Sequence, residues 1–581
     1  MSGNVGSNDA VVLYVCNFHP KAPEIPGQKF TIMRDVEPVL QRYFPWLLII
    51  GIALNVPGLW LEIIEPDGAL YATIAKRMVL HRDWINLWGH GQDWLDKPHF
   101  PFWMAAISYS FFGITSFAYK FPAFLFWLLG LYYTFLTARD LFNVSVARIS
   151  VLISAVALHS TLANFDVRAE PYLTTCIIAA VWHMLGVYQK KSGLHIVAAA
   201  LFAACAIMTK GIFVLLTIGG GWVLFWIFTS QWQQFINYRW WVMLILCLLF
   251  ITPELYSLYA QFDLHPEKVV FGKTGVSGLK FFFWDSQFGR FFNTGPIKGS
   301  GNVTFFMHTT LWAFLPWSVG LVGGIVYLIR FDTNRAAVRW TIYGSTLLTF
   351  ILFSLSRFQL PHYILILFPY FSIITGYFLY QKSKHVQLHI LAKFQQALVF
   401  IAAIAVIALL YFTGLKNEWL ATGVTCLIVA IVNIIPFQNP LQRILYNGYA
   451  MAAIIYIFLF LFFYPFLLQF QSGRSAARTI WENDPKPPVA IYKSLSHSLE
   501  FYAPGEVMIL PSSEKLSAFL TRTPCYIYTS PELADSLLKS GLKADMLATP
   551  AYFRITKLKS GFLNKDTRNR MLEKMSLLYV R

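Results

Sequence analysis

Two acidic residues stand where the first long apolar run of the chain ends. Glu65 and Asp67 belong to the stretch EIIEPDGALYATIAKRM, which follows FPWLLIIGIALNVPGLWL, a run long enough to cross a membrane. A carboxylate held at the mouth of a cavity that opens toward lipid could act as general base for an acceptor hydroxyl or amine, or as a metal ligand. Asp67 could instead be a helix N-cap that accepts hydrogen bonds from the first N–H groups. The sequence alone leaves these interpretations open.

Single cations beside apolar runs could bind a phosphate. Lys97 in DWLDKPHF could hold a phosphate as a point charge, or its ammonium group could reach the lipid headgroups. Lys210 lies in AIMTKGIFVLL, where a tight outer turn would also need one polar residue. Arg290 lies in a long loop with aromatic neighbours, and long loops in compact proteins are often functional. Anion binding is therefore one interpretation of these cations, beside simple turns and contacts with headgroups.

Two further motifs put polar residues beside predicted membrane helices. In ANFDVRAEPYL, Asp166 is the first of three charged residues that lie close together. Ionisable groups at membrane depth are costly and indicate function, unless the loop is simply solvated. In SLSRFQLPHYILILFPYF, Arg357 and Tyr363 stand at the outer end of an apolar run. They could contact a ligand there, or they could anchor the helix at the interface.

These residues need a membrane framework to position them. The chain is 56% hydrophobic and 13% charged, whereas soluble domains usually carry about twice that charged fraction. Many apolar runs approach the roughly 20 residues that span a bilayer. If the Pro- and aromatic-rich segment 98–117 does not cross, the Lys and Arg clusters of the other loops fall on one side, as the positive-inside rule requires. We therefore expect an all-α polytopic membrane protein with about 13 transmembrane helices, a cytoplasmic N-terminus and an outer C-terminus.

Composition divides the chain into three parts. Residues 1–43 are predicted to be a cytoplasmic N-terminal segment, of which 1–32 could be a disordered tail or an upstream extension. Residues 44–470 hold the apolar runs, with a first external loop and interfacial helices at 62–118. After these, short apolar strands (VAIY, VMIL, CYIYT) alternate with helix-like segments. The part 471–581 is therefore predicted to be a small soluble α/β domain on the outer face.

The net charge of +17 does not point to nucleic acid. Excess Lys and Arg in cytoplasmic loops explains a basic balance in a membrane protein, and part of the charge could serve an anionic lipid. No cofactor is predicted with certainty. A divalent metal at Asp67 stays an open alternative. His81, His90 and His99 lack the spacing of a known zinc motif, so the sequence predicts no zinc site there.

The predicted topology gathers the charged motifs on one outer face. A phosphorylated lipid would have its tail in the bilayer and its head at this face. Cations would neutralise the phosphate there, and a carboxylate would activate the acceptor. The acids on this face include Asp67 and Asp166, and the cations include Lys97, Lys210, Arg290 and Arg357.

The order and spacing of these motifs resemble those of the membrane glycosyltransferases that use polyprenyl-phosphate sugars and have the GT-C fold. This superfamily includes the aminoarabinose transferases of lipid A and the protein O-mannosyltransferases. The resemblance covers most of 44–380. It rests on Asp67 with Tyr71 and IAKRM, then on DKPHFPFW, KFPAFLFWLLG, NFDVRAEPYL, TKG, LPW and SRFQLPHYILILFPYF. Gly68 departs from the acid that often follows the first-loop Asp, and Asp96 replaces the commoner Glu.

The resemblance implies an inverting transfer of a sugar from a polyprenyl-phosphate donor to a lipid A-like glycolipid or a protein, at the outer face of the bacterial inner membrane. Asp67 would be the essential aspartate of the first loop, and it would act as the base that deprotonates the acceptor. Asp166 would be the acidic residue of the second loop. Glu65 would be a second ligand or base, or a solvated neighbour. The donor phosphate would contact Lys97, Arg290 and Tyr363 and, as looser assignments, Lys210 and Arg357.

A transporter or flippase for lipid-linked sugars is the main alternative. Such a protein would have paired broken helices at the membrane midplane and repeated halves. The sequence shows no internal repeat, and its charges gather at one face instead of the midplane. A glycosyltransferase whose partners are a lipid-linked sugar, an acceptor and membrane lipid is therefore the preferred interpretation.

Overall fold

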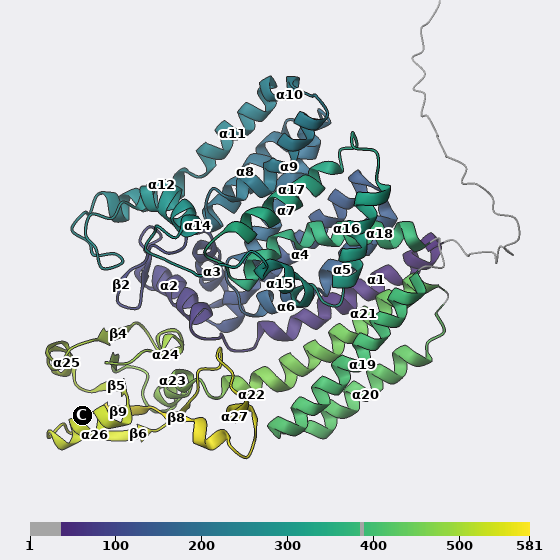
Figure 1. The fold of residues 1–581 in the computed structure, drawn as a ribbon. Helices are drawn as coiled ribbons and strands as arrows, with labels where there is room; N and C mark the ends of the chain where they lie inside the picture. The colour runs from purple at the N-terminus through teal and green to yellow at the C-terminus, as the bar shows by residue number, and fades with distance from the viewer. Residues whose placement is uncertain (1–35, 384–387, 438) are drawn as a thin grey trace, which may run out of the picture. The chain divides into compact units, whose positions relative to one another are not determined.

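Long apolar helices make up most of the chain (Figure 1). The computed structural model describes residues 36–383, 388–437 and 439–581, so the predicted tail 1–32 lies outside the described residues. Within the described ranges, seven helical stretches are long and apolar enough to cross a membrane, which confirms the prediction of a polytopic α-helical membrane protein. They are Glu37–Leu59, Ser116–Leu141, Glu170–Tyr188, Tyr238–Asp263, Pro361–Ser383, His389–Thr413 and Pro440–Leu468.

A bent pair and six shorter apolar helices accompany the long stretches. α5 (Val144–Ala155) and α6 (Leu158–Phe165) meet at an angle of 53°. The predicted count of about 13 spans would follow if this pair and the shorter helices other than α3 also cross, so the count stays a prediction. The shorter helices are α3 (Phe100–Phe112), α8 (Leu194–Lys210), α9 (Val214–Phe228), α16 (Ser318–Phe331), α17 (Trp340–Leu355) and α20 (Glu418–Ile434).

α3 is the helix for which the sequence predicts no membrane crossing. It has 13 residues, which make about 20 Å of helix, less than the roughly 30 Å of a hydrocarbon core. It packs against α2 (Asp67–His81) and α4 (Ser116–Leu141), its neighbours in the chain. Length alone does not single out α3, because α16 has 14 residues, so the position of α3 at the surface stays a prediction.

Small residues bring the apolar helices close together. A Cβ on Gly130 of α4 would lie 2.5 Å from Oγ1 of Thr175 on α7 (Glu170–Tyr188). A Cβ on Gly221 of α9 would lie 1.9 Å from the carbonyl oxygen of Thr341 on α17. Glycines at such positions let helix backbones approach each other closely. This matters in lipid, where the hydrophobic effect does not drive helices together. The close contacts fix α7 and α9, the helices that follow two of the charged motifs.

A five-stranded sheet forms near the C-terminus, as predicted. Its strand order is β4-β3-β5-β9-β6. β3 runs parallel to β4 and β5, whereas β9 runs antiparallel to β5 and β6. The predicted strands VAIY, VMIL and CYIYT are β3, β4 and β5. The bounds are β3 (Val489–Tyr492), β4 (Val507–Leu510), β5 (Cys525–Thr529), β6 (Ala544–Ala548) and β9 (Ser576–Val580).

Helices cover both faces of this sheet. Val489 of β3 lies in a cluster with α23 (Ser472–Asn483), whereas its neighbour Ala490 lies in a second cluster with α25 (Ser513–Phe519) and α26 (Pro531–Lys539). Because side chains alternate between the two faces along a strand, a sheet that is apolar on both faces needs cover on both. α23 begins at Ser472, close to the predicted start of the outer domain at residue 471. This domain boundary stays a prediction.

Buried polar contacts join this α/β domain, called the outer domain after its predicted position, to the predicted first external loop. The ammonium group of Lys76 on α2 donates hydrogen bonds to three carbonyl oxygens at the C-terminal end of α24 (His497–Tyr502). Burial lowers the pKa of Lys76 to about 8, although nearby carboxylates act to raise it. α2 is therefore fixed against the outer domain. The acceptors are the carbonyls of Glu500, Phe501 and Ala503, at 3.0, 2.9 and 2.8 Å.

Candidate active site

Asp67 begins α2 and faces a cation from a distant part of the chain. Pro66 occupies the N-cap position and makes no side-chain cap hydrogen bond, so Asp67 is not the N-cap that the sequence allowed. Its carboxylate instead pairs with Nη1 of Arg168 at 2.9 Å, while 42% of the side chain remains exposed. The positive end of the helix dipole also favours a carboxylate here. Asp67 is thus oriented by a salt bridge and stays accessible to a second molecule.

Arg168 holds a second carboxylate, that of Asp166. Its Nη2 and Nε atoms lie 3.1 Å from Oδ2 of Asp166. Burial raises the pKa of the Asp166 carboxyl above its ordinary value, against the effect of Arg168, and the charge of Asp67 adds to the rise. A Cβ on Gly68 would lie 3.1 Å from Oδ1 of Asp166. The glycine that stands in place of the usual acid therefore leaves room for this carboxylate.

Asp96 brings two of the predicted phosphate ligands together. Nζ of Lys97 lies 2.7 Å from Oδ2 of Asp96, and Nη2 of Arg290 pairs with Oδ1 of the same carboxylate. Burial acts to raise the pKa of Asp96, but the two cations lower it to about 2. The carboxylate is ionised at neutral pH, and two positive charges share one negative charge. The cluster is therefore left with a net positive charge.

Lys210 ends α8 and turns its ammonium group inward. Nζ of Lys210 pairs with Glu170, the first residue of α7, and lies 3.8 Å from the centroid of the Tyr363 ring. Gly211 follows with φ +100°, and a Cβ there would lie 2.1 Å from Nε2 of Gln287. Only glycine adopts this conformation without strain. The tight turn that the sequence allowed is present, and the same turn places the ammonium group beside Tyr363.

Two cavities meet at Arg290 and Tyr363. A polar cavity of about 390 Å³ is lined by both residues and also by Asp67 and Lys97. An apolar cavity of about 510 Å³ is lined by both residues, by Lys210 and mainly by aliphatic and aromatic side chains. The first cavity offers a carboxylate and cations, and the second offers a hydrophobic surface. Together they could bind an amphiphile with an anionic head, while Asp67 could take a proton from a second molecule.

Three predicted site residues line neither of these cavities, namely Glu65, Asp166 and Arg357. Glu65 accepts hydrogen bonds from the backbone N–H of Ser498 and from Oγ of Ser496, the latter at 2.9 Å. Its carboxylate therefore contacts the outer domain. Arg357 is exposed, and its backbone N–H donates to the carbonyl oxygen of Phe291 at 3.1 Å. Contacts of Glu65, Asp166 and Arg357 with a substrate stay predictions.

Four polar residues of the site are absent from the sequence-based set. Arg168 and Glu170 stand in the motif DVRAE beside Asp166, but the spacing of this motif does not show which residues they pair with. His362 lies 3.7 Å from Glu170, from Nε2 to Oε1. Asp96 directly precedes Lys97 and could have been included as its partner. What the sequence could not show is that Arg290 reaches the same carboxylate.

Comparisons with known proteins show that this chain is similar to mannosyl- and arabinosyltransferases. Residues 96–256 match the family model for dolichyl-phosphate-mannose-protein mannosyltransferase. The chain is 24% identical over 450 residues to undecaprenyl phosphate-alpha-4-amino-4-deoxy-L-arabinose arabinosyl transferase 2 of Pseudomonas fluorescens, which covers 72% of this chain and 71% of that protein. The arabinosyl transferase of Pseudomonas aeruginosa is 25% identical over 356 residues, with 58% of this chain and 59% of that protein covered.

A solved structure has the same fold over nearly the whole chain. The crystal structure of ArnT from Cupriavidus metallidurans bound to undecaprenyl phosphate aligns with a TM-score of 0.72 and 18% sequence identity. The alignment covers 94% of this chain and 98% of the other. The apo structure of the same protein gives a TM-score of 0.70. The membrane helices and the outer domain are thus arranged as in that protein.

Proposed function

We propose that the chain belongs to the superfamily of polyprenyl-phosphate-sugar-dependent membrane glycosyltransferases with the GT-C fold. It transfers a sugar from a polyprenyl-phosphate donor to an acceptor at the outer face of the inner membrane. The observation that carries this proposal is the junction of a polar and an apolar cavity at Arg290 and Tyr363. A lipid-linked sugar needs both environments, because its phosphate joins a polar sugar to a hydrocarbon chain.

The donor phosphate binds at this junction. Lys97, Arg290 and Lys210 provide positive charge, and the hydroxyl of Tyr363 donates a hydrogen bond to the phosphate. The cations lie close together before the donor arrives, so they can stabilise the charge that develops on the leaving oxygen without rearrangement. Polyprenyl phosphate leaves as a stable anion, and no general acid is required. The apolar cavity receives the part of the polyprenyl chain next to the phosphate.

Asp67 acts as the general base. It takes the proton from the acceptor nucleophile, which attacks the anomeric carbon while the bond from that carbon to the phosphate oxygen breaks, with inversion. Arg168 is a positioning residue, because its salt bridge keeps the Asp67 carboxylate directed into the polar cavity. Asp166 fixes the other side of the same guanidinium. A divalent ion at Asp67 would have to compete with Arg168 for this carboxylate.

A lipid A-like glycolipid is the preferred acceptor, and undecaprenyl phosphate is the preferred carrier. The similarity to an aminoarabinose transferase extends over 72% of the chain. The match to the protein mannosyltransferase family covers the shorter segment 96–256. A protein hydroxyl is therefore the second candidate acceptor.

The proposed topology follows from the loop charges. Residues 1–43 are cytoplasmic, residues 44–470 form the membrane-embedded transferase domain, and residues 471–581 form a periplasmic domain. Cytoplasmic loops carry the excess of Lys and Arg, so the polar cavity and the outer domain both face the periplasm.

Asp67→Asn tests the assignment of the base. The substitution keeps the size of the side chain but removes the proton acceptor, so turnover should fall about 100-fold or more while donor affinity is unchanged. Turnover would be measured by mass spectrometry of lipid A after incubation of the purified protein with an undecaprenyl-phosphate sugar. Binding of undecaprenyl phosphate would be measured separately. Full turnover in this variant would contradict the assignment.

Two other acids of the first external loop serve as matched controls. The carboxylate of Asp83 accepts hydrogen bonds from the backbone N–H groups of Ile85 and Asn86 and lines neither cavity. Asp83→Asn should therefore keep turnover. Glu65→Gln should also keep most of it, because the Glu65 carboxylate contacts the outer domain. If Glu65→Gln abolishes turnover with the fold intact, Glu65 shares the catalytic work.

The same assay separates a transferase from a flippase. Detergent micelles do not divide the sample into two compartments, so a flippase yields no new product there. A transferase modifies the acceptor in micelles as it does in a bilayer. Formation of the sugar-modified glycolipid in micelles would therefore support a transferase and contradict a flippase.

A further inference from the structure

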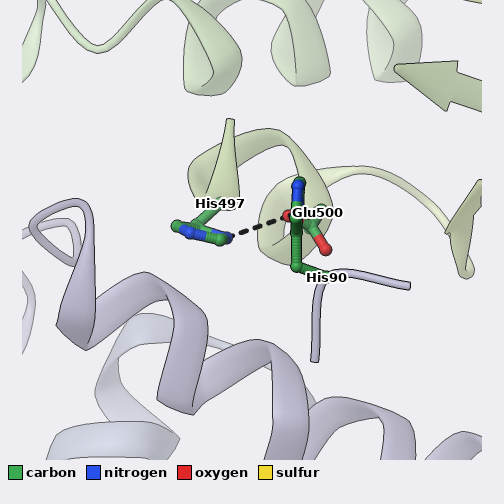
Figure 2. Close-up of side chains that lie close together, drawn as sticks. All are labelled: His90, His497 and Glu500. Atoms are coloured by element: carbon green, nitrogen blue, oxygen red, sulfur yellow. Dashed lines mark hydrogen bonds and ion pairs between the residues drawn. The ribbon is translucent and has the colours of Figure 1, made fainter. Parts of the chain in front are cut away.

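Two histidines and a glutamate meet between the first external loop and the outer domain, as Figure 2 shows. His497 and Glu500 lie one turn apart on α24, and His90 lies in the turn between β1 (Trp88–Gly89) and β2 (Gln92–Asp93). Nδ1 of His90 lies 2.9 Å from Oε1 of Glu500, and Nδ1 of His497 lies 3.0 Å from the same oxygen. All three ligand atoms lie within 4.8 Å of one another.

This separation fits the ligand shell of a transition metal. Zinc binds imidazole nitrogen and carboxylate oxygen at about 2.0–2.2 Å, so ligand atoms around a tetrahedral ion lie about 3.3 Å apart. Small shifts of the three side chains would open the space for an ion between them. A set of two imidazoles and one carboxylate favours zinc over calcium or magnesium, which prefer oxygen ligands.

The backbone around the three ligands is held by contacts of its own. Lys76 donates a hydrogen bond to the carbonyl of Glu500 itself. His90 and Gly91 have φ values of +51° and +74°, as in tight two-residue hairpin turns. A Cβ on Gly91 would lie 3.3 Å from Cβ of Ile509 in β4, so the turn packs directly on the outer domain. The ligands therefore project from a framework that is already in place.

The ligands are shielded but reachable. The side chains of Glu500 and His497 are 5% and 9% exposed, and that of His90 is 28% exposed. His90 and Glu500 line a pocket of about 340 Å³, which provides a path for an ion and a place for a water ligand. None of the three side chains lines the polar cavity that contains Asp67.

Nearby cations are engaged elsewhere. Three carbonyl groups accept hydrogen bonds from Lys76, and Glu506 pairs with Arg77 at 2.9 Å.

The geometry points to a zinc-binding site formed by His90, His497 and Glu500, with water as a fourth ligand. The ion joins two parts of the chain. It would hold α24 against the first external loop, beside the hydrogen bonds that Glu65 accepts from Ser496 and Ser498 on either side of His497. The ion therefore stabilises the docking of the outer domain close to Asp67, without touching the substrate.

Metal analysis of the purified full-length protein tests this site. The protein in detergent would be stripped with a chelator, dialysed against buffer that contains Zn²⁺ and analysed by mass spectrometry. We expect about one tightly bound zinc ion per chain. His497→Ala and Glu500→Gln should each lower zinc affinity by about 10-fold or more. Bound Co²⁺ should give the intense visible absorption of a four-coordinate site in the unsubstituted protein and lose it in both variants.

His81→Ala is the matched control, because His81 lies nearby on α2 and pairs with Glu506 instead of Glu500. This variant should bind zinc normally. Zinc should also raise the unfolding temperature of the unsubstituted protein and of His81→Ala, but not that of His497→Ala.

The outcome that overturns the inference is a hydrogen-bonded cluster without metal. In that case the unsubstituted protein binds no more zinc than the double variant His90→Ala, His497→Ala. Equal loss of zinc in His81→Ala would also overturn it, because binding would then not be specific to the three ligands. Zinc binding is measured without donor or acceptor, so this result is independent of transferase activity.

Discussion

At the residue scale, the cations of the candidate site are shared unequally among its acids. Asp96 alone faces Lys97 and Arg290, whereas Glu170 faces Lys210. The Asp96 cluster therefore carries excess positive charge that a phosphate anion can neutralise. A buried ion pair by itself is weak evidence for stability, because desolvation offsets the attraction. The excess of cations over acids at the junction of the two cavities is more simply explained by binding of an anionic head group.

Lys97→Ala should weaken binding of undecaprenyl phosphate by roughly 10- to 100-fold, because a charge-assisted hydrogen bond contributes about 1.5–3 kcal/mol. Affinity would be measured by titration of the purified protein with the lipid. Lys268→Ala is a suitable control. Its ammonium group also pairs with an aspartate, Asp93, at 2.9 Å, but Lys268 does not line the polar cavity. Unchanged affinity in Lys97→Ala would remove this residue from the phosphate site.

At the scale of secondary-structure elements, α2 connects the candidate base to the outer domain. Its first residue is Asp67, and its buried Lys76 caps the C-terminal end of α24. A cation at this end of a helix is favoured by the helix dipole and satisfies carbonyl groups that lack partners within the helix. The position of α2, and with it the position of Asp67, therefore depends on the outer domain.

Lys76→Met should loosen the docking of α24 without changing the fold of the membrane helices. The substitution leaves three buried carbonyl oxygens without their donor, at a cost of about 1–3 kcal/mol per unsatisfied group. Amide hydrogen exchange should become faster in 497–502. Arg478→Met is the control, because Arg478 forms an exposed ion pair with Glu482. Equal exchange rates in Lys76→Met and the unsubstituted protein would show that other contacts suffice for docking.

At the scale of the whole molecule, the apolar helices and the loops between them each line part of the two cavities. The apolar cavity lies among α9, α17 and the segments that hold Arg290 and Tyr363, whereas the polar cavity extends to α2 and the loop before α7. A donor that spans both cavities would be recognised by its phosphate and also by its hydrocarbon chain.

Leu216→Trp tests the use of the apolar cavity. Leu216 on α9 lines this cavity, so a larger side chain should fill part of it. An overpacked site costs roughly 1–3 kcal/mol, which corresponds to about a 5- to 150-fold rise in KM for a long-chain donor. KM for a short-chain donor analogue should change little. Leu248→Trp places the same bulk on the exposed surface of α11 (Tyr238–Phe250) and should leave both KM values unchanged.

Local patterns in the sequence were sufficient for most elements of the fold. The apolar runs predicted membrane helices, because every backbone polar group in lipid must be satisfied within a helix or a closed barrel. The segment 98–117 was predicted not to cross, which stays a prediction, and it forms a helix of 13 residues. VAIY, VMIL and CYIYT predicted three strands correctly. Each of these features depends on neighbours in the chain.

The sequence by itself thus determined the class of protein and the residue types of the site, whereas the tertiary structure decided which residues meet. Arg168 pairs with Asp67, Arg290 shares Asp96 with Lys97, and His90 lies beside His497 and Glu500. Glu65 turned toward the outer domain and Asp67 toward the polar cavity, although only one residue separates them. The physical reason is that hydropathy and spacing act along the chain, while salt bridges and metal ligands depend on how distant elements pack against each other.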